Sequence, residues 1–527
     1  MDSPTPKIGA LAAAMSRVGF IAFALATAGV IAIVSVCVYR LLFHPLAKYP
    51  GPALAKVTNL YSAYHAWKGD IHIDIYRCHQ KYGDHLRYAP NRLIINTAGA
   101  LRDIYGHHAK VTKFKNYEVL SKQAANLLTL RDKSQHGRRR RVISQAFSES
   151  SLRLFEPKIQ ARVVKFCELL RKAPDGSPTP IQPGEWSGPV DMSKAFNNLA
   201  FDIMTAVSFD TDFNTMEKPE YRFALKAIED SNVRLGVLLQ APELSVRSLD
   251  KKLFPTAYVA KYKFVKFIRM VMAKRLAASK ATSKDIFSFL QDCKDPDSGK
   301  ELSIAELSTE TATFIVAGAD TSSTSMAAVS HYITGSSNCY RRVAEEVRST
   351  FCSVDEICLG PKLNSCAFLR ACIDEALRLS PPGGSALWRE VEQGGTLIDG
   401  TYVPGHCEVA VGIYSIHHSA AYYTKPFTYD PERWYRPLDA KGSRSEAPRS
   451  PYMPFSVGPR SCVGKPLAIA QMMIVFARLL WEYDMRRADY KSDWAEGDYS
   501  STEYALKDHL TAWKEGPVLR FSPRLKP

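Results

Sequence analysis

The chain has 527 residues, of which 46% are hydrophobic, 11% aromatic and 23% charged. These fractions are typical of globular proteins and exclude a disordered or fibrous chain. The formal net charge of +16 favours an acidic partner, and composition leaves open whether that is a protein, an anionic membrane surface or nucleic acid. The eleven cysteines contain no Cys-x-x-Cys pair, which disfavours a zinc finger and favours reduced thiols in a cytosol-facing domain.

The first predicted element is an apolar segment, Val18–Tyr39, which no charged residue interrupts. As a helix it would span about 33 Å, enough to cross the hydrocarbon core of a bilayer. The alternative is a cleaved signal peptide, because Ala26-Thr27-Ala28 resembles a cleavage site, but the apolar run continues well past it. We therefore predict a short tail over 1–17, a single-pass membrane anchor over 18–39, a stiff proline-rich hinge over 40–56 and one domain over 57–527.

Helical periodicity dominates the predicted domain, and short β-like pieces interrupt it. The predicted helices are Ser151–Lys172, Met192–Phe209, Thr256–Ala278, Ser303–Thr334, Asn338–Thr350, Cys366–Leu379 and Lys465–Tyr483. The predicted strands lie within 85–96, 395–404, 406–414 and 516–521. The sequence therefore predicts a mainly α fold with small β-sheets, in one large domain behind the membrane helix.

The predicted helix 303–334 is unusually long and apolar nearly all round, so it should run through the core. It begins with the capping-box pattern Ser303-Ile304-Ala305-Glu306. Its centre, Ala317–Ser325, instead contains a glycine, a carboxylate and five consecutive hydroxyls. One interpretation is a helix contact lined by small residues. We favour a locally opened helix in which Asp320 and Thr321 form an acid–alcohol pair for proton delivery.

A cysteine loop, Phe455–Gly464, precedes the last predicted helix. It places Cys462 at a helix N-terminus, where the dipole and free N–H groups favour the thiolate. Gly458 permits a tight turn, Gly464 lets a flat ligand approach the backbone, and Arg460 offers a forked donor for a carboxylate. A structural cysteine in a turn is the alternative, but this set of residues is what a thiolate ligand of haem iron requires.

These residues carry a family resemblance. Phe455–Gly464 matches the Phe-x-x-Gly-x-Arg-x-Cys-x-Gly signature, and the chain thereby resembles the cytochrome P450 haem-thiolate monooxygenases. Three more matches follow in the family's order: Ala317–Thr321 in the oxygen-activating helix, Glu375-Ala376-Leu377-Arg378, and Pro431-Glu432-Arg433-Trp434 with Trp in place of Phe. The resemblance covers residues 45–520 and the anchor, and is greatest to fungal membrane-bound members of natural-product biosynthesis.

The resemblance implies haem b with Cys462 as its axial thiolate and only iron ligand. It makes Asp320 and Thr321 the catalytic pair, and assigns Glu375, Arg378 and Arg433 to a structural network, for which a plain surface salt bridge is the alternative. The implied cofactor-binding residues are Cys462, Arg460, His136, Arg140, Arg389, Phe455, Gly458 and Gly464, with His136 in a position where the family has Trp. The substrate pocket is expected along 116–130 and at Phe314, Ala317, Ala386, Leu387, Leu510 and Thr511.

The implied activity is an O₂-dependent monooxygenation that hydroxylates, epoxidises or otherwise oxidises an apolar small molecule. Because the chain has no Gly-rich dinucleotide fingerprint, NADPH would act indirectly through a flavoprotein reductase, with cytochrome b5 as a second donor. The implied location is the endoplasmic reticulum membrane, in contact with lipid, with the catalytic domain facing the cytosol. A solvated face, or a docking site for an acidic redox partner, is then the interpretation of Arg138, Arg139 and Arg141.

Three alternatives remain at this stage. One is a haem-thiolate isomerase, dehydratase or ring-rearranging enzyme, and another is a membrane-tethered haem-binding protein without turnover. The third, a nucleic-acid binder, lacks a recognisable module or an aromatic stacking platform, so we expect no nucleic-acid partner. The sequence does not identify the substrate.

Overall fold

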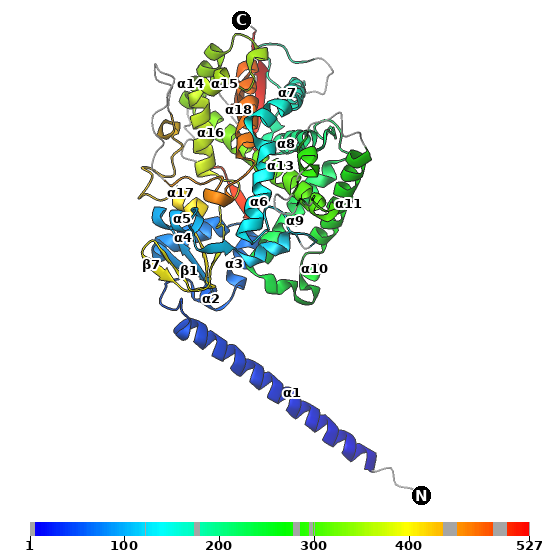
Figure 1. Cartoon of the computed structure of the whole chain (residues 1–527), viewed down its shortest axis with the longest axis vertical. Coiled ribbons are helices and arrows are strands. Elements are labelled where there is room, and N and C mark those ends of the chain that lie inside the picture. Colours follow the sequence, from blue (N-terminus) through cyan, green and yellow to red (C-terminus); the bar gives the residue numbers. More distant parts are fainter. Residues whose placement is uncertain are drawn as a thin grey trace.

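A computed structural model describes residues 6–121, 123–172, 180–277, 285–292, 294, 299, 301–435, 451–488 and 503–525. Helices form most of a rounded body, and one long helix, α1, projects from the end of that body where α2, α3 and α10 lie (Figure 1). Strands β1 and β7 lie near the same end of the body as the start of the domain (Figure 1).

The first part of the chain forms the projecting helix and the sheet-bearing end of the body. Its elements are α1 (Pro6–Val38), the π-helical turn η1 (Tyr39–Phe43), α2 (Ala53–Val57), α3 (Leu60–Lys68), α4 (Ile71–Tyr82), β1 (His85–Ala89), β2 (Arg92–Ile95), α5 (Ala98–Tyr105), β3 (Val111–Lys113) and η2 (Lys115–Leu120).

The middle of the chain supplies most of the helical layer. Its elements are α6 (Lys133–Ile143), η3 (Ser144–Phe147), α7 (Glu149–Leu170), β4 (Val190–Asp191), α8 (Met192–Phe209), α9 (Arg222–Gln240), η4 (Pro242–Ser248), α10 (Leu249–Leu253), α11 (Pro255–Ala277), α12 (Ile286–Gln291) and α13 (Ile304–Thr334).

The last part of the chain adds elements both to the sheets and to the helical layer. Its elements are α14 (Ser337–Thr350), η5 (Val354–Glu356), α15 (Pro361–Ser365), α16 (Ala367–Leu379), β5 (Arg389–Val391), β6 (Thr396–Ile398), β7 (Thr401–Val403), β8 (Glu408–Ala410), α17 (Ile413–His417), η6 (Pro431–Arg433), η7 (Gly458–Arg460), α18 (Lys465–Glu482), β9 (Tyr483–Arg487), β10 (Leu506–His509), β11 (Thr511–Lys514) and β12 (Val518–Pro523).

Helix α1 contains the predicted membrane segment. Residues Gly19–Phe43 have a mean hydropathy of 2.6 and are exposed along their length, so among the described residues this helix is long and apolar enough to span a membrane. The helix begins at Pro6, so it takes in most of the predicted tail 1–17, of which residues 1–5 lie outside the described part of the chain. Arg87 on β1 donates to Arg40 O at 2.7 Å and thereby connects the C-terminal end of the anchor to the sheet.

Helix α13 runs through the core and packs against α8, as its apolar composition predicts. Both hydrogen bonds of the predicted capping box are present between Ser303 and Glu306. The helix is continuous across its polar centre, so the expected local opening is not a break in the helix. Gly318 instead lets α8 approach, because a Cβ there would come within 2.5 Å of the side chain of Met204.

Four small sheets complete the fold. The five-stranded sheet has the order β1-β2-β8-β5-β3, in which β2 and β8 run parallel and the other neighbours run antiparallel. A three-stranded sheet (β4-β12-β9) and two hairpins (β6-β7 and β10-β11) make up the rest. The five-stranded sheet places β3 and β5 side by side, with Lys113 opposite Arg389, and this pairing matters for the site below.

Candidate haem-thiolate site

The cysteine loop is held in one conformation by backbone contacts. The N–H of Cys462 donates to Phe455 O at 2.8 Å, which closes the loop before α18 begins at Lys465. Gly458 has φ +71°, and a Cβ there would lie 1.9 Å from Tyr105 O. Glycine is therefore required at position 458 both by its left-handed backbone and by the close approach of α5.

Cys462 faces an enclosed space. Its side chain is exposed, yet burial among protein atoms raises the pKa of its thiol. The two facts agree if the sulfur opens onto a space inside the protein. The backbone N–H groups of Gly464 and Lys465 and the charge of Arg140 favour the thiolate, as the sequence predicts, but desolvation outweighs them. The N–H groups and Arg140 thus act in the predicted direction, and burial of the sulfur opposes them.

Gly464 borders the same space. A Cβ at this position would meet Cys462 Sγ and Phe147 only at 3.9 Å, which is ordinary contact, and its backbone φ is −82°. Nothing in the described part of the protein therefore requires glycine at 464. A flat ligand in the space beside the sulfur would require it, and this fits the role expected from the sequence.

Five basic side chains from separate segments come together next to the loop. Burial and the charges of its neighbours lower the pKa of His136 to about 3, so the ring is neutral. Those neighbours, in order of their effect, are Arg460, Lys113, Arg140 and Arg389. Burial, with Arg389 beside it, likewise lowers the pKa of Arg460 to about 10. His136 and Arg140 lie on α6, Lys113 and Arg389 lie on the paired strands β3 and β5, and Arg460 lies in the cysteine loop. The fold therefore assembles a cationic cluster from distant parts of the chain.

No carboxylate is hydrogen-bonded to this cationic cluster within the described chain. Arg460 donates to Leu130 O and Arg131 O at 2.6 and 2.8 Å, and Arg140 donates to the backbone and side chain of Ser461 at 2.5 and 3.1 Å. Arg389 donates to Trp388 O at 2.9 Å. Among the described residues Asp132 acts on Arg460 as a negative charge but is not hydrogen-bonded to it, and an excess of positive charge remains, which is costly in a half-buried place unless an anion joins it.

Lys113 belongs to this cluster but was not predicted from the sequence. Its side chain is buried, and burial together with Arg389 and Arg460 lowers its pKa well below the usual value. Its Nζ lies 4.3 Å from the ring centre of Tyr117 and has no carboxylate partner among the described residues. Lysines also stand at positions 110 and 115 on either side, so only the strand pairing with β5 distinguishes Lys113 from them.

The three residues of the predicted structural network are joined, and Glu375 and Arg378 are fully buried. Arg378 binds both oxygens of Glu375 at 2.8 Å, and both side chains have no exposed surface. Arg433 Nε donates to Glu375 Oε1 at 3.3 Å. The remaining donors of Arg378 reach the carbonyls of His417 and Pro426, each at 2.7 Å. The alternative of an exposed i, i+3 salt bridge is therefore excluded.

Two residues extend the network, and sequence reasoning did not find them. Trp434 Nε1 donates to Glu375 Oε2 at 2.6 Å. His417 accepts from Met453 N through Nε2 at 2.9 Å, and its Nδ1 lies 3.1 Å from Arg378 O. Burial holds the pKa of His417 well below its usual value, so the neutral ring donates from Nδ1 and accepts at Nε2. The network thus reaches the chain two residues before the cysteine loop.

The acid and the alcohol of α13 point to different surroundings. Thr321 donates to Ala317 O at 2.5 Å, and Ala317, although in the middle of a core helix, is exposed. This face of α13 therefore borders an internal space, and Phe314 on the same side packs against Phe147, which adjoins Gly464. Asp320 is buried instead and bonds to Asn232, Thr511 and Lys514 from other elements.

The expected pocket residues divide into groups. Ala386 and Leu510 share a core cluster with Tyr117 and Leu239, while Leu387 packs in a different cluster with Tyr105. Thr511 is engaged with Asp320. Within the expected stretch 116–130, Asn116 donates to Leu239 O at 3.1 Å, which joins this stretch to α9. The structure therefore brings Ala386 and Leu510 into one apolar cluster and packs the side chain of Leu387, the next residue in the chain, into another, while Phe314 and Ala317 lie one turn apart on α13.

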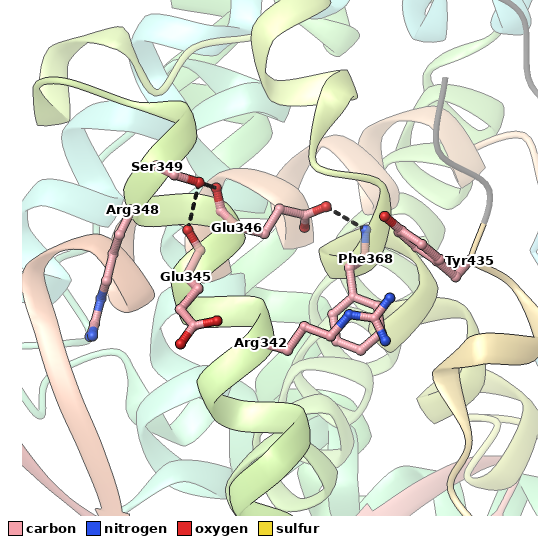
Figure 2. Close-up of a pocket in the computed structure, with 7 residues that line it drawn as sticks. All are labelled: Arg342, Glu345, Glu346, Arg348, Ser349, Phe368 and Tyr435. Atoms are coloured by element: carbon pink, nitrogen blue, oxygen red, sulfur yellow. Dashed lines mark hydrogen bonds between the residues drawn. The ribbon is translucent and has the colours of Figure 1, made fainter. Parts of the chain in front are cut away.

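A surface hollow of about 580 Å³ lies elsewhere, along α14. Figure 2 shows its seven lining residues, with the Arg342 guanidinium near the side chains of Phe368 and Tyr435. Arg342 lies 3.9 and 4.6 Å from those two ring centres and pairs with Glu432, and Glu346 accepts from two backbone N–H groups of α16. Because these charged groups are already paired, the hollow offers no comparable candidate site.

Comparison with known proteins agrees with this geometry. The sequence model of the family described as Cytochrome P450 matches residues 49–495. A cytochrome P450 monooxygenase of Penicillium oxalicum, poxM, is 48% identical over 92% of this chain and 91% of its own length. The cytochrome P450 monooxygenase atnE of Emericella nidulans is 43% identical over 94% of this chain and 95% of its own.

A solved structure is similar in fold. The crystal structure of a cytochrome P450DA heme domain matches with a TM-score of 0.68 over 86% of this chain and 94% of that chain. Its sequence is only 16% identical, so this likeness concerns the arrangement of helices and sheets alone.

Proposed function

The chain belongs to the cytochrome P450 family, a family of haem enzymes with a cysteine thiolate, and from this premise we propose that Cys462 is the residue that ligates the iron. The protein is a monooxygenase of this family. The observation that carries the assignment is an accessible sulfur, surrounded by protein atoms, on a constrained loop. Bound iron would supply the positive charge that a thiolate needs at this place.

The cationic cluster would hold the two haem propionates. Arg140, Arg389 and Arg460 are the predicted donors, and Lys113 joins them, with neutral His136 as a further hydrogen-bonding group. The unpaired positive charge in this place supports the role, because two carboxylates would offset it. Gly458 lets the loop pack under α5, and Phe455 and Gly464 would line the flat face of the cofactor.

The chemistry that bound haem supplies is reductive activation of dioxygen, with one oxygen atom going to the substrate and the other to water. The protein's own contribution begins with Thr321, whose hydroxyl lies on the face of α13 that borders the internal space. Asp320, one residue away and buried, is the acid that replenishes protons toward this hydroxyl. Phe314, Ala317 and Leu510 would exclude water and orient an apolar substrate over the reacting position.

The family implies a reductase partner and a small-molecule substrate. We extend this to an NADPH-dependent flavoprotein reductase, with cytochrome b5 as a second electron donor, and to an apolar intermediate of a fungal secondary-metabolite pathway as substrate. We further propose that α1 anchors the protein in the endoplasmic reticulum membrane, with the domain on the cytosolic side. The apolar exposed surface of α1 supports contact with lipid.

The test is replacement of the sulfur. In the purified protein, reduction and carbon monoxide should give the red-shifted Soret band of thiolate ligation, and Cys462→Ser should abolish that band. Cys352→Ser is the matched control, because Cys352 is exposed and distant in sequence from the loop. If Cys462→Ser kept the band, or if the control lost it, another ligand would have to be sought.

Two other activities are weighed by separate measurements. An isomerase or dehydratase would turn over without consuming NADPH, and a haem-binding protein would consume none with any substrate. The relatives are named as monooxygenases, which does not favour either activity. NADPH consumption with purified reductase and a panel of apolar compounds identifies the monooxygenase, and product formation without NADPH separates the isomerase or dehydratase from a haem-binding protein.

A further inference from the structure

One buried carboxylate joins α13 to two other structural elements. Asp320 Oδ2 accepts from Asn232 Nδ2 on α9 at 2.8 Å and from the hydroxyl of Thr511 on β11. Its other oxygen, Oδ1, lies 3.4 Å from Lys514 Nζ, also on β11. We call Asp320, Asn232, Thr511 and Lys514 the acid clamp. The position of the acid therefore depends on how α9 and the β10–β11 hairpin are docked.

Lys514 is the charged member of the acid clamp. It is only 3% exposed, and its Nζ also donates to Asn197 Oδ1 on α8 at 2.7 Å and to Ser323 Oγ on α13 at 2.8 Å. Asp320 is the carboxylate that pairs with it in the described structure. Since three acceptors around one ammonium fix its place, Lys514 holds Asp320 from a set position.

The same hairpin carries a residue of the expected pocket. Leu510 is the tip between the paired residues His509 and Thr511, and it has φ +89°, a conformation that costs free energy for a residue with a side chain. The tip is held on both sides, because the ring of His509 bonds to Ala66 O at 2.9 Å and Thr511 bonds to Asp320.

Helix α9 closes the arrangement. A Cβ at Gly236 would lie 3.2 to 3.4 Å from the backbone of His509 and Leu510, so the helix touches the hairpin tip. Asn232 lies one helical turn earlier and reaches Asp320. Movement of the hairpin tip or of α9 would therefore change the position of the Asp320 carboxylate.

We infer that Lys514 is a positioning residue that fixes Asp320 for proton delivery and links that delivery to the docking of the pocket hairpin and α9. The inference rests on the function proposed above. Without Lys514 the buried carboxylate would lose its counter-ion and one of its fixed contacts, so its setting beside Thr321 would change. The haem ligand and the cationic cluster contain none of these residues, so haem binding should be unaffected.

The experiment uses the full-length protein with reductase and dioxygen itself as the probe, because the substrate is unidentified. Reduction of dioxygen to hydrogen peroxide takes two electrons and two protons, whereas reduction to water takes four of each. Lys514→Met should shift the products from water toward hydrogen peroxide, with the water-forming share falling about tenfold, less than the loss of about a hundredfold expected for Asp320→Ala. The solvent isotope effect on NADPH oxidation should rise, which loss of stability alone would not cause.

A matched control and a second variant keep the test decisive. Lys507→Met removes an exposed lysine from the same hairpin. It should change neither the ratio of water to hydrogen peroxide nor the solvent isotope effect. Thr511→Val keeps the side-chain shape but removes one donor to Asp320, so it should shift the products in the same direction. It provides the test if Lys514→Met does not fold. Unchanged product ratios in both clamp variants would overturn the inference.

A measurement without turnover separates this inference from the proposed function. In a double-mutant cycle with Asp320→Asn and Lys514→Met, the loss of Tm in the double variant should be smaller than the two single losses added together. Additive losses would mean that the two side chains do not hold one another, and would overturn the clamp. Failure of the proposed function would instead appear as a wild-type protein without the red-shifted carbon monoxide band.

Discussion

The indole N–H of Trp434 donates to Glu375 Oε2 at 2.6 Å, inside a network whose carboxylate has no exposed surface. The residue stands where the family motif has phenylalanine, which cannot donate. The tryptophan therefore adds a hydrogen bond to the carboxylate while its ring packs against Tyr452, 4.5 Å away between ring centres. The substitution thereby strengthens the network that reaches the cysteine loop through His417.

The first prediction is that Trp434→Phe destabilises the protein although it restores the common residue. One hydrogen bond to a buried charged group is lost, so the free energy of unfolding should fall by about 1–2 kcal/mol. Denaturant unfolding followed by tryptophan fluorescence and by the haem Soret band measures it. Trp186→Phe is the control, because Trp186 contacts Arg486 through the face of its ring, which phenylalanine also offers. An unchanged midpoint in Trp434→Phe would contradict the role given to the indole.

The second prediction contrasts two glycines. Gly458→Ala should prevent the cysteine loop from forming, because its Cβ would lie 1.9 Å from Tyr105 O and its φ is +71°. Tyr105 cannot easily move, since its hydroxyl donates to Leu387 O at 2.9 Å and accepts from Val411 N at 3.1 Å. Gly137→Ala, on an exposed turn of α6 with nothing near, should instead stabilise by about 0.5–1 kcal/mol. The yield of carbon monoxide-binding protein and the Tm distinguish them, and similar effects of the two changes would refute the argument.

Much of the fold follows from local pattern. All seven predicted helices occur within two residues of their expected ends, and the four predicted strand regions all contain strands. Helices α3, α4 and α9 were not predicted, although their apolar periodicity is no weaker than that of the predicted helices α7 and α11. In α9 the polar Asn232 and Arg234 lie buried because they meet Asp320 and Asp250, and a local pattern does not reveal such partners from other elements.

The candidate site also contains some features that local sequence predicts and others that it does not. The cysteine loop and the Glu375–Arg378 pair are encoded by residues close in sequence, so their spacing predicts them. Lys113 and Lys514 act through strand pairing and hairpin docking, which no local pattern reveals. At Cys462 the expected effect of the N–H groups is present, but a dipole argument does not count the desolvation that three-dimensional packing imposes, and this burial raises the pKa of the thiol.

The third prediction concerns Lys113, whose removal should have opposite effects with and without haem. Lys113→Met removes a buried charge that has no carboxylate partner, so the haem-free protein should become more stable. The haem-bound protein loses one partner of a propionate, and transfer of haem to apomyoglobin should become about tenfold faster, equivalent to about 1.4 kcal/mol. Lys115→Met, an exposed lysine two residues later, should change neither. Slower or unchanged haem transfer in Lys113→Met would remove this residue from the propionate site.

The last prediction is a pH dependence that arises from Glu310 on α13. Burial raises the pKa of this carboxyl to about 7, against the opposing effects of Arg139 and Leu127 N–H, which donate to Oε1 at 3.3 and 2.7 Å, while Glu306 adds a like charge. Its Oε2 is buried without a partner. Because the folded state then holds its proton more tightly than the unfolded chain does, this contribution to stability is present below about pH 4.5 and is lost as the pH rises to about 7.

Glu310→Gln keeps an acceptor for Leu127 N–H but cannot ionise, so its stability relative to the wild type should increase from pH 5 to about pH 7 and then level off. The total difference should be about 3 kcal/mol, measured by denaturant unfolding at each pH. Glu306→Gln is the control: hydrogen bonds from Ser303 and Arg139 outweigh burial and lower the pKa of Glu306, so its effect belongs below pH 4.5 and should be constant in this range. A pH-independent difference for Glu310→Gln would show that the carboxyl is already ionised at pH 5, and that Arg139 outweighs burial there.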